Sequence, residues 1–136
     1  MRPPYAYVPG LTPRHPDGLF DEWKETLPSL SECPAWKGGW ACLEGGFFWE
    51  AHELFEPVWM QTRPETAERH MAQAAIQLAN AALKLKMGRH RAVLRLCDDC
   101  ESLLALIGCR QVLGVSPSRI RNRLVGLRHL SKLIEM

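Results

Sequence analysis

Three long stretches of this chain repeat apolar residues at the spacing of an α-helix, and they cover residues 65–88, 89–108 and 116–136. A fourth stretch, residues 45–60, does the same with several aromatic residues among its apolar positions. No segment shows sustained apolar–polar alternation rich in β-branched residues, so strands are not expected. The pattern therefore predicts an all-α fold, a single-domain antiparallel helical bundle of about four to five helices.

The segments before residue 45 are shorter and richer in proline. Residues 1–18 hold five of the ten prolines, which fix φ and remove backbone donors, so an extended N-terminal arm is predicted there. Because this arm contains Tyr5 and Tyr7, we expect it to pack on the helical bundle domain of residues 19–136. Residues 19–27 are expected to form a short helix, and residues 28–39 a connection that ends in a turn of helix. Gly88 is predicted to close the helix of residues 65–88 as a left-handed cap.

The net charge of +2 is spread unevenly over the 136 residues. Residues 1–70 hold six Lys and Arg against eleven Asp and Glu, whereas residues 71–136 hold eleven against four. Such asymmetry indicates either a nucleic-acid surface or two halves that pack together with complementary charge. The near-neutral total favours the second interpretation. A nucleic-acid surface would use the basic residues of the last helix, Arg119, Arg121, Arg123, Arg128 and Lys132.

The cysteines and the absence of a long apolar run bear on the cellular compartment. No run is long enough to span a membrane, and the N-terminus lacks the apolar core of a signal peptide, so a cytoplasmic protein is expected. Five cysteines without an export signal argue against a disulfide framework. Cys97 and Cys100 form a C-x-x-C within a helical pattern, and with Cys33 and Cys42 they could complete a four-thiolate zinc site. Free thiols are the preferred interpretation.

The stretch GGFFWEAHELFEPVWM, residues 45–60, combines four polar residues with large apolar ones. At 100° per residue, His52 and Glu56 lie about 40° apart, at one edge of the apolar arc and beside Trp59. Glu50 falls about 160° from His52, and Glu53 points away from both. Only His52 and Glu56 can therefore share a ligand, while Glu50 and Glu53 are expected to cap a helix or pair with arginines of the basic half.

A row of polar residues follows the next helix. It consists of His70, Gln73, Gln77, Asn80 and Lys84, which fall within about 80° of one another on the helical wheel. The row is either the solvent face of an amphipathic helix or one wall of a polar pocket. In the second interpretation Gln77, Asn80 or Lys84 faces His52 and Glu56 across the bundle.

The runs FFWEAHELFEPVW and QAAIQLANAALKLKMGRHRAVLRL resemble the bacterial and archaeal family of small all-α proteins known as domain of unknown function number 309. The resemblance extends from the proline-rich lead YVPGLTPRHP to about Leu104. The signature of this family is His, three residues, Glu, two residues, then Trp or Tyr, which His52, Glu56 and Trp59 match in full. The resemblance implies a helical fold with metal binding at this motif and no established activity. Many relatives have an aromatic–His pair where this chain has Leu83 and Lys84, whose ammonium would repel an ion.

Several functions remain open from the sequence. Imidazole with carboxylate suits zinc, iron or manganese, so His52 and Glu56 are the candidate metal ligands. The same two residues could instead form a structural pair at the core edge or a general acid–base pair. Small-ligand pocket candidates are Glu50, Glu53, Trp59, Gln77, Asn80 and Lys84. A protein-interaction or homodimerisation module is the alternative function, and nucleic-acid binding is a second. No residue indicates a substrate or settles whether the protein is an enzyme.

Overall fold

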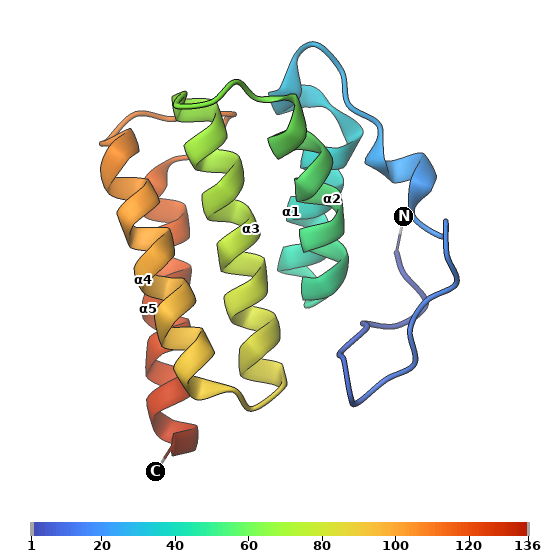
Figure 1. Cartoon of the computed structure of the whole chain (residues 1–136), viewed down its shortest axis with the longest axis vertical. Helices are drawn as coiled ribbons and strands as arrows, with labels where there is room; N and C mark the ends of the chain where they lie inside the picture. Colours follow the sequence, from blue (N-terminus) through green and yellow to red (C-terminus); the bar gives the residue numbers. More distant parts are fainter. Residues whose placement is uncertain (1, 136) are drawn as a thin grey trace.

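The computed structural model describes residues 2–135 of the chain. Met1, the first residue of the predicted arm, and Met136, the last residue of the predicted final helix, lie outside the described residues. It contains five α-helices: α1 (Pro34–Glu44), α2 (Phe48–Gln61), α3 (Ala67–Lys86), α4 (His90–Ile107) and α5 (Pro117–Glu135). Two short 3-10 helices precede them, Asp21–Lys24 and Leu30–Glu32. Within the described residues the only β-type pairing is an isolated bridge between Val112 and Val115. The all-α, single-domain bundle expected from the sequence is confirmed (Figure 1).

The helix α3 lies at the centre of the bundle. It packs against α2 on one side and α4 on the other, while α5 packs against both α3 and α4 and α1 packs against α2 (Figure 1). Six alanines of α3 are buried, and their small side chains allow the neighbouring helices to approach closely: Ala72, Ala74, Ala75, Ala79, Ala81 and Ala82. Larger core side chains come from the neighbouring helices, including Phe55 of α2, Leu104 of α4 and Leu124 of α5, all fully buried.

The helix α1 differs from the sequence prediction, which placed a connection at residues 28–39. The helix begins at Pro34, a residue whose fixed φ suits the first helical turn, and it continues through Gly38 and Gly39. Two adjacent glycines lower helix propensity, but a Cβ at position 39 would lie 2.4 Å from Cε1 of Phe55. The glycine therefore lets the buried Phe55 ring pack directly on the α1 backbone, and tertiary packing outweighs propensity. The predicted helix of residues 19–27 is also shorter, a 3-10 turn over Asp21–Lys24.

The ends of α3 follow from local chemistry. At its start the Thr66 hydroxyl accepts a hydrogen bond from the backbone N–H of Arg69. At its end Gly88 has φ +73°, so the predicted left-handed cap is confirmed. The next helix, α4, starts two residues later, which makes α3 and α4 antiparallel neighbours.

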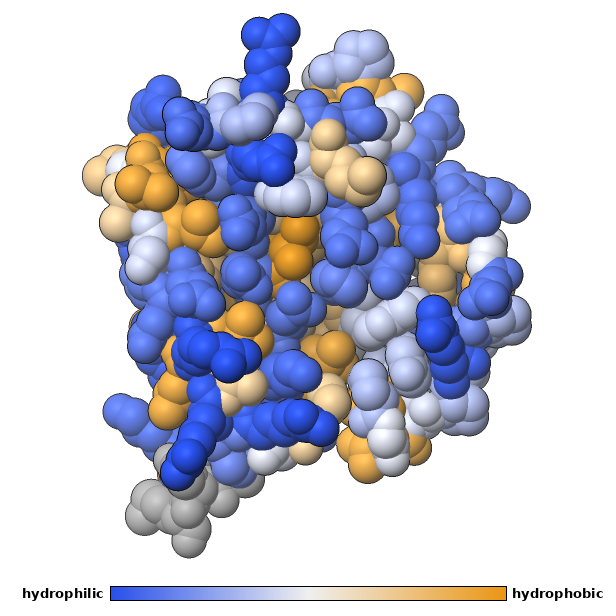
Figure 2. Space-filling view, viewed as in Figure 1, coloured by the Kyte–Doolittle hydropathy of each residue, from blue (hydrophilic) through white to orange (hydrophobic). Residues whose placement is uncertain are grey.

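The surface carries charges of both signs in the ion pairs that join the helices. Glu44 of α1 pairs with Arg123 (Nη1–Oε2 3.1 Å) and Arg119 (Nη2–Oε1 3.6 Å) of α5. Within the basic half, Arg128 of α5 contacts Asp98 and Glu101 of α4. Some arginines of the basic half thus pair with an acid of the acidic half, and Arg128 pairs with acids of its own half. The face shown in Figure 2 is mainly hydrophilic, with hydrophobic side chains in small separate groups.

Residues 2–18 contain no helix or strand and lie beside the first part of the helical domain (Figure 1). Pro3 and His15 in this segment are nevertheless buried, and the backbone N–H of Tyr7 donates a hydrogen bond to Glu50 of α2. The segment is therefore attached to α2 by polar contacts. Among the described helices none is both long and apolar enough to cross a membrane.

Candidate functional site

Three side chains of α2 form an outward-facing polar cluster: His52, Glu53 and Glu56. Nε2 of His52 lies 3.5 Å from Oε1 of Glu56, one helical turn further on, as the i, i+4 spacing predicts. Nδ1 of His52 lies 4.0 Å from Oε1 of Glu53. The wheel placed Glu53 facing away, but its side chain is long enough to approach the other edge of the ring. The imidazole therefore has one carboxylate near each nitrogen.

This outward cluster is half-exposed, with 22% of the His52 side chain, 23% of Glu53 and 49% of Glu56 accessible to solvent. Nδ1 of His52 is itself buried and makes no hydrogen bond within the described residues. Glu53 also accepts a hydrogen bond from Nζ of Lys24 at 3.2 Å. Lys24, Glu53, His52 and Glu56 consequently lie in one row of charged and polar side chains, and Glu56 is the most exposed of the three α2 members.

Trp59, the third residue of the signature expected from the sequence, lies further along α2 and contacts the start of α3. The guanidinium carbon of Arg69 stands 4.1 Å above its ring centroid, a cation–π contact. Its indole Nε1 is buried and has no hydrogen-bond partner in the described part of the chain. Trp59 thus joins α2 to α3, and its observed contact is with Arg69.

The polar row of α3 is half-buried at each of Gln77, Asn80 and Lys84. Within residues 2–135 no hydrogen bond or ion pair joins any of these three side chains to His52 or Glu56. The interpretation that they complete a pocket around His52 stays a prediction, since a ligand or water could bridge the groups.

A second polar cluster on α2 is buried and was not anticipated as a pair. Glu50, fully inaccessible, accepts a hydrogen bond at Oε2 from the Tyr7 backbone N–H (2.8 Å). The same oxygen lies 2.6 Å from Nε2 of His15, which is 4% exposed. A carboxylate that accepts both hydrogens satisfies the two donors together. We refer to these two residues as the His15–Glu50 pair.

Aromatic rings enclose the His15–Glu50 pair. The His15 ring centroid lies 4.5 Å from that of Tyr5, 5.0 Å from Phe20 and 6.0 Å from Trp49. The remaining atoms of the pair, Nδ1 of His15 and Oε1 of Glu50, are buried without hydrogen-bond partners in the described structure. Water is largely excluded, so Oε2 of Glu50 relies on its two protein donors for hydrogen bonds. The expected pairing of Glu50 with an arginine of the basic half is wrong, because its partners come from the N-terminal arm.

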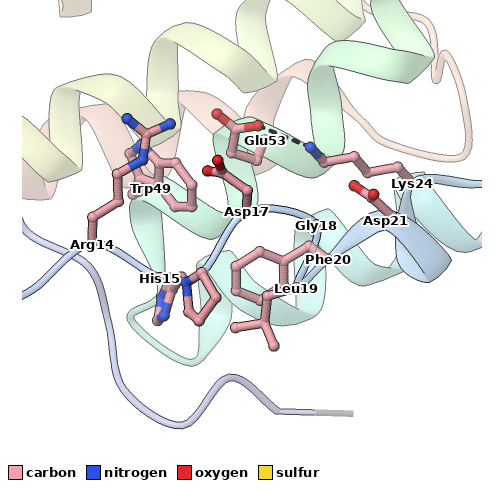
Figure 3. A pocket seen from close by; sticks show the side chains of 11 residues that line it. Arg14, His15, Asp17, Gly18, Leu19, Phe20, Asp21, Lys24, Trp49 and Glu53 are labelled. Carbon is pink, nitrogen blue, oxygen red and sulfur yellow. Dashed lines mark hydrogen bonds and ion pairs between the residues drawn. The ribbon is translucent and has the colours of Figure 1, made fainter.

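A small cleft lies between the arm and α2, close to the His15–Glu50 pair (Figure 3). Its volume is about 90 Å³. The Trp49 ring and the Arg14, Asp17 and Asp21 side chains line it, and the ion pair of Lys24 with Glu53 crosses one side. Glu53 therefore belongs to this cleft and to the outward cluster at once. Its expected pairing with an arginine is wrong too, because its cationic partner is Lys24.

Four of the five cysteines are core side chains, and Cys109 is exposed. All five are free thiols, and Cys33, Cys42, Cys97 and Cys100 are buried. Burial raises the pKa of Cys42 to about 11 and that of Cys100 to about 12, and Sγ of Cys100 donates to the Ala74 carbonyl. In the part of the chain that the structure describes, no three His, Cys, Asp or Glu side chains are grouped so as to hold one metal ion. The preferred interpretation of free thiols agrees with this arrangement.

These features define a small all-α protein in which α3 packs against α4 and two polar clusters lie on α2. Residues 36–96 match the family model described as "Domain of unknown function (DUF309)", so the family expected from the sequence is confirmed over this segment. The segment contains Glu50 and the signature residues His52, Glu56 and Trp59, but not His15. Neither a curated protein nor a solved structure matches the chain.

Proposed function

We propose that this protein binds a divalent metal ion, zinc, iron or manganese, on the outer face of α2 through His52 and Glu56. The observation that supports the proposal is the position of the His52 ring between two carboxylates. Glu56 stands at the accessible nitrogen Nε2, where an ion would bind. Oε1 of Glu53 stands 4.0 Å from the buried nitrogen Nδ1, and a small movement of this carboxylate toward the ring on metal binding would let it accept the Nδ1 proton and fix the tautomer.

The donor geometry fits a single ion. Two ligands at about 2.1 Å from a tetrahedral ion lie about 3.4 Å apart. Nε2 of His52 and Oε1 of Glu56 are 3.5 Å apart, so both can reach one ion without a change in the helix. Glu53 lies at the opposite edge of the ring and cannot join them. The ion would therefore have two protein ligands and complete its coordination with water, which favours exchangeable binding.

An ion with open coordination positions polarises a bound water or carbonyl group. On this chain, His52 and Glu56 would hold the ion, and Glu53 would orient His52. Lys24 holds Glu53 in turn, since Nζ donates to Oε2 at 3.2 Å. Because Lys24 also lines the small cleft beside the arm, the cleft and the proposed ion site share one ion pair.

Isothermal titration calorimetry with Zn²⁺ and with Mn²⁺ tests the proposal on the full chain. We expect one saturable site in the unmodified protein. His52→Ala and Glu56→Gln should each weaken binding by at least about tenfold, and Glu53→Gln by about tenfold through the orientation of the ring. His70→Ala, which removes a half-buried histidine of α3 outside the cluster, is the matched control and should bind as the unmodified protein does. No saturable binding, or equal binding by His52→Ala, would refute the proposal.

Three other expectations stay predictions. The division into an arm of residues 1–18 and a bundle of residues 19–136 is one, although the arm's contacts with Glu50 favour a single folded unit. A homodimer is the second. The third is that nucleic acid is not the partner, and the engagement of Arg119, Arg123 and Arg128 with carboxylates supports it.

A further inference from the structure

A hydrophobic groove lies where the start of α2, the end of α3 and the middle of α5 meet. Its volume is about 370 Å³, within the range of roughly 300–1,000 Å³ common for small-molecule sites. Phe48 of α2, Leu85 of α3 and Leu127 and Leu130 of α5 supply its apolar walls. Leu130 remains 48% exposed. None of the lining residues belongs to the outward cluster or to the His15–Glu50 pair.

Gly126 opens the groove on the α5 side. It lies in the interior of a 19-residue helix, where glycine is less stable than alanine. A Cβ at this position would meet no atom within 4 Å, and its φ is not positive. Neither close packing nor backbone conformation therefore requires glycine here. Its structural consequence is a missing side chain in the wall of the groove.

The charge around the groove is of one sign. Lys86 of α3 and Arg123 of α5 are among the lining residues, and no lining residue is acidic. Arg123 pairs with Glu44 on the solvent side at 3.1 Å, whereas Lys86 is exposed and makes no ion pair with the described side chains of residues 2–133. An apolar floor beside an exposed ammonium suits a ligand with an aliphatic chain and an anionic head.

We propose that this groove binds a small anionic amphiphile, an unbranched aliphatic carboxylate whose chain lies over Leu85 and Leu127 and whose head faces Lys86. The chain would fill the space left by Gly126 and remove apolar surface of Leu130 from water. The site is separate from the proposed metal site, since the lining contains none of its residues. Binding at the groove therefore does not depend on His52.

Decanoate is the probe that tests this proposal, with decanol and decyltrimethylammonium as ligands of equal chain length but neutral or positive head. All three are titrated into the full chain, decanoate and decyltrimethylammonium below their micellar concentrations and decanol below its solubility limit, and binding is followed by calorimetry and by amide chemical shifts. Decanoate should bind at one saturable site and more tightly than the other two. The largest shifts should fall on residues of α3 and α5 that line the groove.

Three variants locate the site. Gly126→Leu fills the groove with a residue of higher helix propensity, so it should fold at least as well and lose saturable binding. Lys86→Gln should weaken decanoate about two- to fivefold, the effect of one exposed charge, and leave decanol unchanged. His52→Ala should bind decanoate normally.

The proposal is overturned if decanoate shows no saturable binding or if Gly126→Leu binds it as well as the unmodified protein does. Equal binding of the three probes would contradict the anionic head. Light scattering that shows a dimer, dissociated by Gly126→Leu, would instead assign the groove to a second copy of the chain and would also overturn the proposal.

Discussion

The helix α2 presents two histidine–carboxylate contacts that differ in burial. On one side Glu50 is fully buried and lies 2.6 Å from His15. On the other side His52 lies 3.5 Å from Glu56, with 22% and 49% of the two side chains accessible. Two glutamates of one helix, Glu50 and Glu56, thus differ widely in their exposure to water. The comparison separates a contact enclosed by the protein from a contact that solvent can reach.

Burial decides this difference because an ion removed from water depends on its protein partners. Glu50 has two N–H donors and an aromatic enclosure, so exchanging its partners for a ligand would require the arm to leave. About half of the Glu56 side chain is accessible to solvent, so replacing its contact with His52 by a metal ion should cost little folding free energy. The next three predictions test this contrast through stability.

The largest effect is expected from Glu50→Leu. The substitution keeps approximate volume but leaves the buried Nε2 of His15 and the part-buried Tyr7 backbone N–H without their acceptor. Breaking a buried pair in this way costs about 3–5 kcal/mol of unfolding free energy. Urea unfolding followed by circular dichroism measures it. A loss below about 1 kcal/mol would show that the His15–Glu50 pair does not hold the arm to α2.

The second-largest effect is expected from a double-mutant cycle that combines Glu50→Leu with His15→Leu. Because the two side chains depend on each other, the double variant should be more stable than the sum of the two single losses predicts. We expect a coupling energy of about 2–3 kcal/mol from the same urea experiment. Strictly additive losses would mean that the 2.6 Å contact contributes nothing specific.

The smallest effect is expected from Glu56→Gln in the outward cluster. An exposed ion pair contributes about 0–1 kcal/mol, and the glutamine side chain keeps the packing of the methylene groups. The unfolding free energy should therefore change by less than about 0.5 kcal/mol, while metal binding weakens by at least about tenfold. A loss comparable to that of Glu50→Leu would make the His52–Glu56 contact structural and would erase the contrast between the two clusters.

The sequence predicted those parts of the molecule that depend on local periodicity. The helices α3, α4 and α5 and the His52–Glu56 contact all follow from the 3.6-residue repeat. The helix α1 was missed because its Gly38–Gly39 step has low propensity, and only the distant Phe55 ring explains Gly39.

The partner of Glu50 could not be predicted for a related reason. His15 lies 35 residues away in a segment without periodicity, so no pattern indicates where its ring points. The wheel placed Glu50 correctly on the flank away from His52, but it could not show that the arm covers that flank. One signal was available, namely a lone histidine among the aromatic residues and prolines of the arm.

The contrast between the two histidines is tested most directly by nitrogen NMR of the imidazole rings during a Zn²⁺ titration of the full chain. We expect the ring-nitrogen resonances of His52 to shift with saturation and those of His15 to stay unchanged. Assignments follow from His52→Ala and from His15→Leu. A shift of the His15 resonances during the titration would contradict this contrast. Unchanged His52 resonances in the Zn²⁺-saturated protein would contradict it as well.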